Sequence, residues 1–231
     1  LVLHNNAVMW SEGPYHLMRY HPTTGTTILK ISDNPDASIG PIIPDYYSNM
    51  ITYYTLGYNT YPNYNYTFYV YDTSISNSSL ARKTITSVLR PFYDSSFPQY
   101  IDISNNVVAW AQPSSSMNIT NVVCDIYTAD ITVPNPLPRY ELTAACGSIS
   151  IYNNKIVFKN NVGEVAIYDR SSKSITIIPH AKQYSKKIVD GKIAVIGSYG
   201  TPTNTFDIYL YNVLDNTKTL MKPNIVNSNL I

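Results

Sequence analysis

Charged side chains are scarce in this chain. Lys, Arg, Asp and Glu together make up 13% of its 231 residues, against roughly 25% in ordinary soluble domains. The net charge is +1, and the densest basic group is Lys182, Lys186 and Lys187. Because affinity for nucleic acid depends mainly on neutralising phosphates, this composition disfavours a nucleic-acid partner. No apolar run approaches the roughly 18 residues of a membrane-spanning segment, so no membrane span is expected within the chain.

Motifs for catalysis and metal binding are also missing. The glutamates are Glu12, Glu141 and Glu164, and the histidines are His4, His16, His21 and His180. The spacing His-x-x-x-His, the motif Cys-x-x-Cys, a Gly-rich phosphate loop and a serine nucleophile elbow do not occur. The sequence therefore offers no catalytic residue, no metal site and no cofactor site.

What the chain does contain is a repeated hairpin pattern. In residues 148–158 an alternating strand, the dipeptide Asn153-Asn154 and a second strand follow one another. Asn tolerates the positive φ that both central residues of a type I′ turn need, so this stretch predicts a β-hairpin. The same form recurs at Asn5-Asn6, Asn105-Asn106, Asp190-Gly191 and, most weakly, Ser48-Asn49.

A second signature follows each hairpin. It is a strand of alternating aromatic and apolar residues that ends in a polar residue able to hydrogen-bond the backbone of the next turn. These closing residues are His21, Asp72, Asp130, Asp169 and Asn212. A polar turn and a fourth strand come next. Repeats of about 40–50 residues with four strands each are typical of a β-propeller.

The predicted fold is therefore all-β: a five-bladed β-propeller of four-stranded antiparallel blades. One domain spans residues 1–231, with blades at about 1–40, 41–97, 98–147, 148–183 and 184–231. The chain begins at Leu1 without Met, which suggests a processed or trimmed chain, and it can be one domain of a longer protein.

The two cysteines are placed to form a disulfide. The third repeat predicts one strand at 124–131 and the next at 139–146. If Ile131 pairs with Arg139, Cys124 lies opposite Cys146, within the short Cβ separation that a disulfide requires. A bridge implies an oxidising compartment. The alternative is two buried free thiols, and a slip of one residue in register would prevent the bridge.

Three glycosylation sequons agree with an extracellular location. They begin at Asn65, Asn77 and Asn118, and each falls where the pattern predicts a loop or turn. Surface loops of secreted proteins are where such sequons are modified. We therefore expect an extracellular, cell-surface or virion-surface protein.

The Asn-Asn hairpin and the strand of the type Ile-Tyr-x-Tyr-Asp together resemble β-propeller repeats of secreted and cell-surface proteins. The resemblance includes TolB-like and archaeal surface-layer-type propellers, covers nearly the whole chain, and implies a fold but no activity. The low charge and high Tyr, Asn, Ser and Thr content also resemble extracellular proteins of acid-living hyperthermophilic archaea and their viruses. Carboxylates protonate in acid, so neutral polar groups are the more dependable surface there.

The long insertions are expected on one face of the propeller. In a four-stranded antiparallel blade the second connection lies opposite the first and third, and the second connections of repeats 2, 3 and 5 are long. Loop tyrosines there have no core position to fill and are expected to bind a sugar or anchor a protein. They are Tyr58, Tyr61, Tyr64, Tyr66 and Tyr199. A Tyr-rich loop that packs only on itself is the alternative.

Three functions follow from these patterns. The leading one is a non-enzymatic extracellular propeller for surface assembly or adhesion, which binds a protein or glycan. The alternative is a secreted carbohydrate-active enzyme, a class that needs two acids at a fixed separation. Asp102 and Glu12 are its candidates, although a structural role suits each better. A lectin or solute sensor with one pocket per blade is the third, and the unlike insertions disfavour it.

Overall fold

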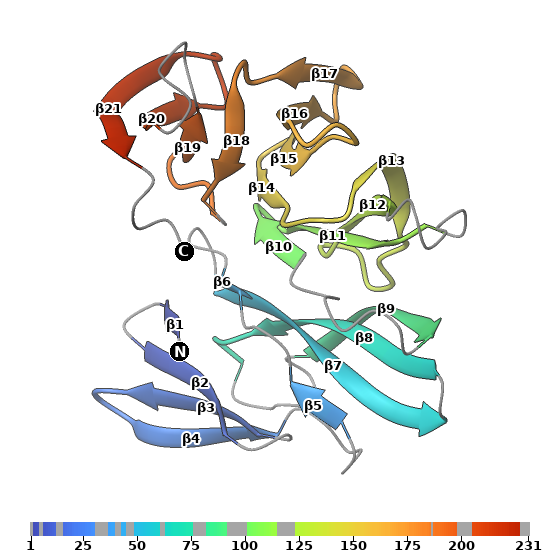
Figure 1. Ribbon diagram of the computed structural model, residues 1–231. Helices are drawn as coiled ribbons and strands as arrows, with labels where there is room; N and C mark the ends of the chain where they lie inside the picture. Colours follow the sequence, from blue (N-terminus) through green and yellow to red (C-terminus); the bar gives the residue numbers. More distant parts are fainter. Residues whose placement is uncertain are drawn as a thin grey trace. The chain divides into compact units, whose positions relative to one another are not determined.

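The computed structural model describes residues 2–4, 7–12, 16–30, 37–39, 43–44, 49–60, 63–75, 82–91, 101–114, 123–185, 187–197 and 205–226. These residues form strands and turns and contain no helix (Figure 1). The chain divides into two compact units. The first comprises Leu1–Trp110 and Tyr127–Tyr140, and the second comprises Ala111–Ile126 and Glu141–Ile231.

Five antiparallel sheets are present among the described residues. The first contains β1 (Val2–His4), β2 (Ala7–Glu12), β3 (His16–His21) and β4 (Gly25–Lys30), in that order. The second contains β7 (Met50–Thr60), β8 (Asn63–Asp72) and β9 (Arg82–Pro91), and both β5 (Ala37–Ile39) and β6 (Ile43–Pro44) pair with β7. The third contains β10 (Ile101–Ser104), β11 (Val107–Pro113), β12 (Val123–Asp130) and β13 (Arg139–Ala145).

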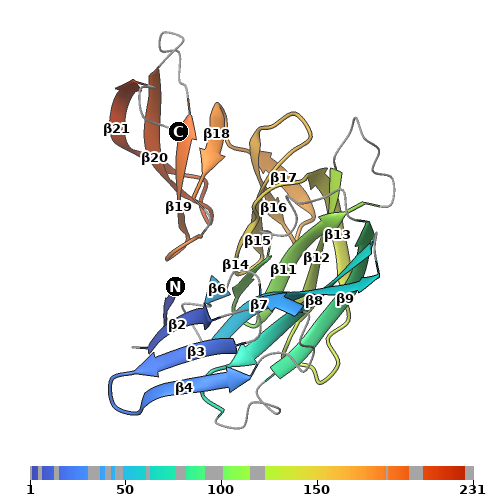
Figure 2. The same ribbon diagram turned by 60° about the horizontal axis from the view of Figure 1, so that its bottom comes forward.

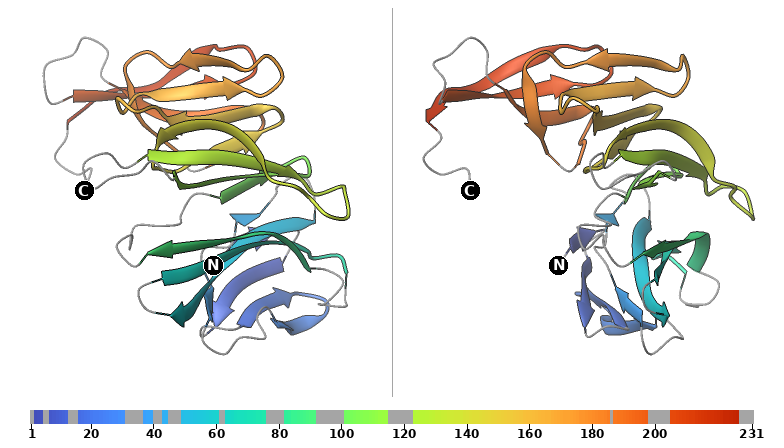
Figure 3. Two further views of the ribbon diagram at one scale, coloured as in Figure 1. Left: turned by 90° about the vertical axis from the view of Figure 1, so that its right-hand side faces the viewer. Right: turned by 45° about the vertical axis from the view of Figure 1, so that its right-hand side comes forward.

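The last two sheets lie within the second unit. One contains β14 (Ser150–Tyr152), β15 (Lys155–Lys159), β16 (Val165–Asp169) and β17 (Ser174–Ile177). The other contains β18 (Ala181–Tyr184), β19 (Lys192–Gly197), β20 (Thr205–Asn212) and β21 (Lys218–Val226). In four of the sheets strands adjacent in sequence are adjacent in space, as their gradual change of colour shows (Figure 3), and in the second sheet β5 and β6 both pair with β7. This up-and-down order confirms the all-β, antiparallel prediction.

The predicted hairpin turns are present where they are described. Ser104 pairs with Val107 and Tyr152 with Lys155, so two residues form each turn. Asn105 and Asn106 both have positive φ (48° and 62°), as a type I′ turn requires. Of the other pair only Asn153 has a positive φ (52°), so that turn is not type I′.

Two inner strands differ from the predicted repeats. Ala37–Ile39 was expected to end the first repeat, but β5 pairs with Thr55–Gly57 of β7 in the second sheet. Ala181–Tyr184 was expected near the end of the fourth repeat, but β18 is the inner strand of the fifth sheet. Pairing with the next sheet satisfies the backbone groups of both segments. The weak hairpin at Ser48-Asn49 has residues 45–48 outside the described part.

Each third strand ends at its predicted closing residue, and that residue caps the turn. The Oδ1 of Asp72 accepts the N–H of Ser74 at 2.9 Å, and the Oδ1 of Asp130 accepts the N–H of Thr132 at 2.9 Å. Asp169 and Asn212 cap their turns in the same way. The Oδ1 of Asp169 accepts the N–H of Ser171 at 2.8 Å, and the Oδ1 of Asn212 accepts the N–H of Leu214 at 3.0 Å. In the first sheet the ring Nδ1 of His21 lies 3.2 Å from the N of Thr23 and takes the acceptor role.

The same turn also bonds the inner hairpin. The residue after each closing residue donates its N–H to the carbonyl of the second residue in the Asn-Asn-type turn. The four bonds are Thr73 to Asn49 (2.8 Å), Ile131 to Asn106 (2.9 Å), Arg170 to Asn154 (2.8 Å) and Val213 to Gly191 (2.8 Å). We call these the turn-to-turn bonds. In the first sheet the corresponding residue is Pro22, which has no N–H to donate.

Buried side chains from several strands form the core of each unit. In the first unit Trp110 is 1% exposed, and its ring lies 6.1 Å from Phe68 and 5.8 Å from Tyr127. Trp110 is therefore a packing residue of this core. The second unit has an apolar cluster that joins its two sheets, including Val157, Ile167, Ile193, Val195 and Tyr209.

Candidate functional site

The insertion of the second repeat is a strand hairpin and not the loop that was expected. Leu56 pairs with Tyr66, and Thr60 pairs with Asn63 at its tip. Tyr58 therefore belongs to β7, and Tyr64 and Tyr66 belong to β8 (Figure 2). The alternation of Tyr with Asn and Thr suits a pleated strand, because Tyr and Thr have high β propensity. Tyr61 and Tyr199 lie outside the described residues.

Of the three sequon asparagines, only Asn65 belongs to the described part of the chain. Asn65 lies in mid-strand, paired with Gly57 on one side and Leu89 on the other, so it is not in the expected loop. Asn77 and Asn118 lie outside the described residues. Glycosylation of the three sites therefore remains a prediction.

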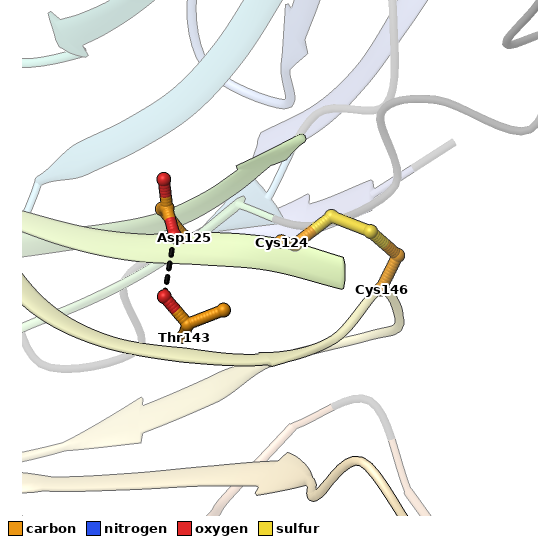
Figure 4. Close-up of a disulfide and its surroundings, with 4 residues drawn as sticks. All are labelled: Cys124, Asp125, Thr143 and Cys146. Atoms are coloured by element: carbon orange, nitrogen blue, oxygen red, sulfur yellow. Dashed lines mark hydrogen bonds between the residues drawn. A yellow bond between two sulfur atoms is a disulfide. The ribbon is translucent and has the colours of Figure 1, made fainter. Parts of the chain in front are cut away.

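Cys124 and Cys146 form a disulfide. Their sulfurs are 2.02 Å apart and their Cα atoms 4.8 Å apart, which confirms the predicted close approach of the two residues (Figure 4). Cys124 is fully buried in β12. Beside the bridge, the Oγ1 of Thr143 donates a hydrogen bond of 2.6 Å to the Oδ1 of Asp125. Within the second unit the hydrogen bond joins β12 to β13, and the bridge joins β12 to the residue that follows β13.

Glu141 is held in an ion pair. Its side chain is 1% exposed, and its Oε1 accepts a bond of 3.0 Å from the Nε of Arg170, whose side chain is 13% exposed. The hydroxyl of Tyr168 lies 3.3 Å from its other oxygen and donates to it. Because Arg170 and Tyr168 belong to the fourth sheet and Glu141 to β13, this cluster joins the two sheets inside the second unit.

Asp102 has a structural position. It lies in β10 at the edge of its sheet, is 1% exposed, and its Oδ1 accepts the N–H of Ile103 at 2.9 Å. This agrees with the interpretation that favoured structure over catalysis. Glu12 ends β2, and its side chain lies outside the described part. The structure therefore does not bring the two candidate acids together as a described pair.

Asp169 combines a turn cap with an ion pair. Its Oδ2 lies 2.5 Å from the Nζ of Lys155, the residue opposite it in the β15–β16 ladder. The Lys155 ammonium, with the N–H groups of Ser171 and Ser172, lowers the pKa of the Asp169 carboxyl below its ordinary value. The pair stabilises a turn at the surface and has no visible chemical role.

A cluster of tyrosines and arginines in the first unit was not predicted. Tyr53 stacks on Tyr69 at 5.2 Å between ring centroids, and the guanidinium of Arg82 lies 5.2 Å from the Tyr69 centroid. Burial raises the pKa of Tyr53 far above its ordinary value, and the Arg82 charge only partly opposes this. Burial likewise raises the pKa of Tyr71. The alternation of these residues along β7 and β8 was the available signal, but it was used only to recognise the strands of the repeat.

An open depression of about 320 Å³ lies at the start of the fifth sheet. Its lining residues are Glu164, Ile177, Pro179, His180, Ala181 and Lys182. His180 has a φ of 61° and follows Pro179 in a turn closed by the bond from Ala181 N–H to Ile178 O. Glu164 is fixed by Asn160, whose Nδ2 donates to it at 3.0 Å. Within the described residues, no three His, Cys, Asp or Glu side chains group as metal ligands.

Nothing in the described part of the chain has the helical length and hydrophobicity needed to cross a bilayer.

Comparison with known proteins identifies the class of fold. The chain is similar to TolB from Acinetobacter baumannii, with a TM-score of 0.56 and 13% identity over 96% of this chain. It is also similar to the acylaminoacyl peptidase of Pyrococcus horikoshii, with a TM-score of 0.59 and 13% identity over 94% of this chain. The β-propeller domain of the Trilobed protease from Pyrococcus furiosus gives a TM-score of 0.52 and 15% identity over 82%. The chain therefore has a β-propeller-like fold.

The likeness stops at the fold. No family model and no curated protein sequence matches the chain. The chain spans 53% of the length of TolB, 36% of the peptidase and 58% of the protease propeller domain. A propeller scaffold carries many unrelated functions, so function has to come from the site.

Proposed function

We propose that this chain is an extracellular, non-enzymatic five-bladed β-propeller that serves in surface assembly or adhesion. It binds a protein or a glycan through the face formed by the connections between second and third strands. The observation that carries the proposal is the Cys124–Cys146 disulfide within a propeller-like scaffold, because disulfides persist in oxidising compartments.

The geometry of the second sheet supports a binding role for this face. β7 and β8 contain 11 and 10 residues, whereas the corresponding β15 and β16 contain 5 each. The hairpin of β7 and β8 therefore extends beyond the length that closing a blade requires. It contains Tyr58, Tyr64 and Tyr66, and residues on strands hold their position better than residues on loops.

The placement of the buried acids agrees with a non-enzymatic role. Glu141 is neutralised by Arg170, and Asp102 accepts a backbone N–H in a buried strand. A glycosidase pair needs one acid that can donate a proton and a second at a fixed separation across a sugar. Neither of these two acids is available for such work.

A glycan array combined with hydrolysis assays tests the proposal. The purified chain is expected to bind a subset of immobilised glycans, or a protein of the native surface, without cleaving chromogenic glycosides. The double variant Tyr64→Ala and Tyr66→Ala is expected to lose at least tenfold in affinity. Tyr140→Ala is the control, because Tyr140 is a 54% exposed tyrosine at the start of β13, a strand that does not pair with β7 or β8. Hydrolysis abolished by Asp102→Asn or Glu12→Gln would overturn the proposal and favour the enzyme.

Intact mass of the natively produced chain tests the compartment. Without reductant we expect a mass about 2 Da below that of the reduced chain, from one disulfide. Enzymatic deglycosylation is expected to lower the mass further. Free thiols and no glycan would contradict an extracellular location. A glycan on Asn65 would move the binding site away from the β7–β8 hairpin, because Asn65 lies between Tyr64 and Tyr66.

A further inference from the structure

The depression of about 320 Å³ lies at the end of the fourth sheet where its second and third strands connect. Lys159 and Val165 form the last pair of the β15–β16 ladder at this end, and Glu164 directly precedes β16. The N–H of Ile178 donates to the oxygen of Val165 at 2.9 Å, so the link from β17 to β18 reaches the same end of the sheet. The depression is therefore at the end of a sheet to which the proposed function assigns binding.

Glu164 lines this depression with a carboxylate that its own turn holds in place. Its N–H donates to the Oδ1 of Asn160 at 2.9 Å, and its Oε2 accepts a hydrogen bond of 3.0 Å from the Nδ2 of Asn160. The N–H of Asn160 also donates to the backbone oxygen of Glu164 at 2.9 Å. In the contacts that the described residues make, the Oε1 of Glu164 has no partner. A carboxylate oxygen fixed in this way can accept a hydrogen bond from a ligand with little loss of side-chain entropy.

Lys182 brings a positive charge to the same depression. Ala181 pairs with Gly197 and Gln183 pairs with Ile196, so Lys182 is one extra residue in β18. A bulge of this kind re-aims a side chain, and here both Lys182 and Gln183 are exposed, which regular alternation of faces would not give. Among the residues that the structure describes, the Lys182 ammonium has no ion-pair or hydrogen-bond partner.

The two charged groups do not pair with each other in the described part of the chain, although both line one depression. An ammonium only donates hydrogen bonds, and a carboxylate only accepts them. Because the charges of Glu164 and Lys182 cancel, an anionic ligand is attracted by Lys182 but repelled by Glu164, and a cationic ligand meets the reverse. A hydroxyl group both donates and accepts. A neutral ligand with several hydroxyls therefore satisfies both residues and leaves no net charge.

Size and shape narrow the ligand to one sugar residue of a longer chain. The volume lies near the lower end of the range of roughly 300–1,000 Å³ that is typical of ligand sites, which suits a single hexose ring. Ile177, which is 45% exposed, and Pro179 add apolar surface for the C–H groups of the ring. A zwitterionic amino acid would also balance the charges, but sites for free small ligands bury roughly 70–90% of the ligand surface. This depression is open, so it suits the end of a glycan that continues into solvent.

We infer that Glu164 and Lys182 form a binding site for one neutral hexose residue of a glycan. The Oε1 of Glu164 accepts a hydrogen bond from one sugar hydroxyl, and the Nζ of Lys182 donates a hydrogen bond to the oxygen of another. Both are charge-assisted hydrogen bonds, which are stronger than neutral ones. The inference rests on the proposed glycan binding at this end of the sheets, and it adds the class of glycan and the residues of the second unit that recognise it.

An array of neutral, acidic and amino-sugar glycans tests the site. We expect the purified chain to bind neutral hexose-terminated glycans, with competition by at least one of methyl glucoside, methyl galactoside and methyl mannoside. Lys182→Gln and Glu164→Gln are each expected to lower the affinity about tenfold, because each removes one charge-assisted bond.

Both substitutions are expected to leave the midpoint of thermal unfolding unchanged. Lys182 is exposed, and Gln at position 164 keeps an oxygen that can accept the Asn160 bond. Lys192→Gln is the matched control and is expected to bind like the native chain. Lys192 is an exposed lysine at the opposite end of the fifth sheet, beside the turn at Gly191.

The outcomes separate this inference from the proposed function. A preference for acidic or amino-sugar glycans, or competition by glycine as strong as that by the best methyl hexoside, overturns the inference. Native-like affinity in Lys182→Gln or in Glu164→Gln also overturns it. If Tyr64→Ala with Tyr66→Ala abolishes glycan binding while these two variants retain it, only the inference fails and the proposed function stands. If no glycan binds, the inference fails, and binding to a protein of the native surface then decides the proposed function.

Discussion

Glu141 sits almost fully buried between two sheets of the second unit, and its charge requires a partner. Replacing it with Gln removes the charge and leaves Arg170 buried without a counter-ion. Breaking one side of such a pair typically costs about 3–5 kcal/mol, so we expect Glu141→Gln to lower the free energy of unfolding by about 3 kcal/mol. Urea unfolding measures the change.

A double variant serves as the control for Glu141. Glu141→Met with Arg170→Met removes both charges and keeps the volume, and such replacements are often neutral. We expect the double variant to recover most of the stability that Glu141→Gln loses. A loss of less than about 0.5 kcal/mol in Glu141→Gln, within the usual range of surface changes, would contradict the role of this pair.

The ionisation of Asp169 is expected to make the stability of the folded chain depend on pH in acid. The Lys155 bond lowers the pKa of its carboxyl in the folded chain, so the ionised form is the stabilising one. That contribution is present above the unfolded pKa of about 3.9 and is lost as pH falls through the folded value. We expect Asp169→Asn to reduce the loss in free energy of unfolding between about pH 5 and pH 3. The reduction should be less than about 1 kcal/mol, because the pair is at the surface.

Stability measured by urea at several pH values checks the Asp169 prediction. Asp125→Asn is the comparison, because its carboxylate accepts a neutral hydroxyl and has no cation partner in the described contacts. If Asp169→Asn loses as much stability at pH 3 as at pH 6, the lowered pKa does not contribute.

Single residues were predictable where one local rule decides them. The closing residues were identified because Asp, Asn and His accept from the backbone two residues on, and each does so. The cluster of Tyr53, Tyr69 and Arg82 was not predicted, because it depends on which side chains of β7, β8 and β9 meet on one face of the sheet. Sequence alternation gives the face but not the neighbour.

At the scale of elements, Gly191 tests the turn geometry. It has a φ of 72°, and a Cβ there would lie 3.1 Å from Cδ1 of Leu214. We expect Gly191→Ala to destabilise the chain by about 1–2 kcal/mol, from the left-handed conformation and the contact. Thermal or urea unfolding measures it.

Gly147 is the matched control for Gly191. It does not have a positive φ, and a Cβ there would meet only Ala145 O, at 4.0 Å. Gly147→Ala is expected to be neutral or to stabilise by about 0.4–1 kcal/mol, because it restricts the unfolded chain. Equal effects of the two substitutions would show that the turn does not need glycine.

The sequence predicted that hairpins exist, but it was a weaker guide to which sheet each inner strand joins. Asn-Asn and Asp-Gly dipeptides define turns locally. The inner strand β18 is set by pairing with β19 across a shift in register at Ala181 and Gln183, which no local rule encodes. The Tyr-rich insertion looked like a loop because polar residues alternate with its tyrosines, yet that alternation also suits a strand exposed on one face.

At the scale of the molecule, the disulfide closes a loop across 22 residues of sequence separation. The chain-entropy estimate for a loop of that size is about 3 kcal/mol. We therefore expect Cys124→Ser with Cys146→Ser to lower the midpoint of thermal unfolding by about 6–12 °C. Reductant should lower the midpoint of the native chain by a similar amount and leave the double variant unchanged. A reductant effect on the double variant would point to a different target.

The propeller-like class was predictable from the spacing of the closing residues, because four-stranded antiparallel units that recur at such intervals are typical of it. Whether the sheets close into a ring could not be predicted in the same way, because closure depends on contacts between distant repeats. The function was given only by class, because the tyrosines proposed to bind a partner lie in the least regular repeat. The part of the chain that repeats best is therefore the least informative about binding.

The turn-to-turn bonds make this chain a scaffold for engineering. They close one end of four sheets through backbone atoms, so each bond depends on the N–H of its donor residue and is lost when proline replaces that residue. The connection between second and third strands lies at the other end of each sheet and takes no part in the bonds. New segments can therefore be grafted there, above all between β15 and β16, while the sheet below keeps its closure.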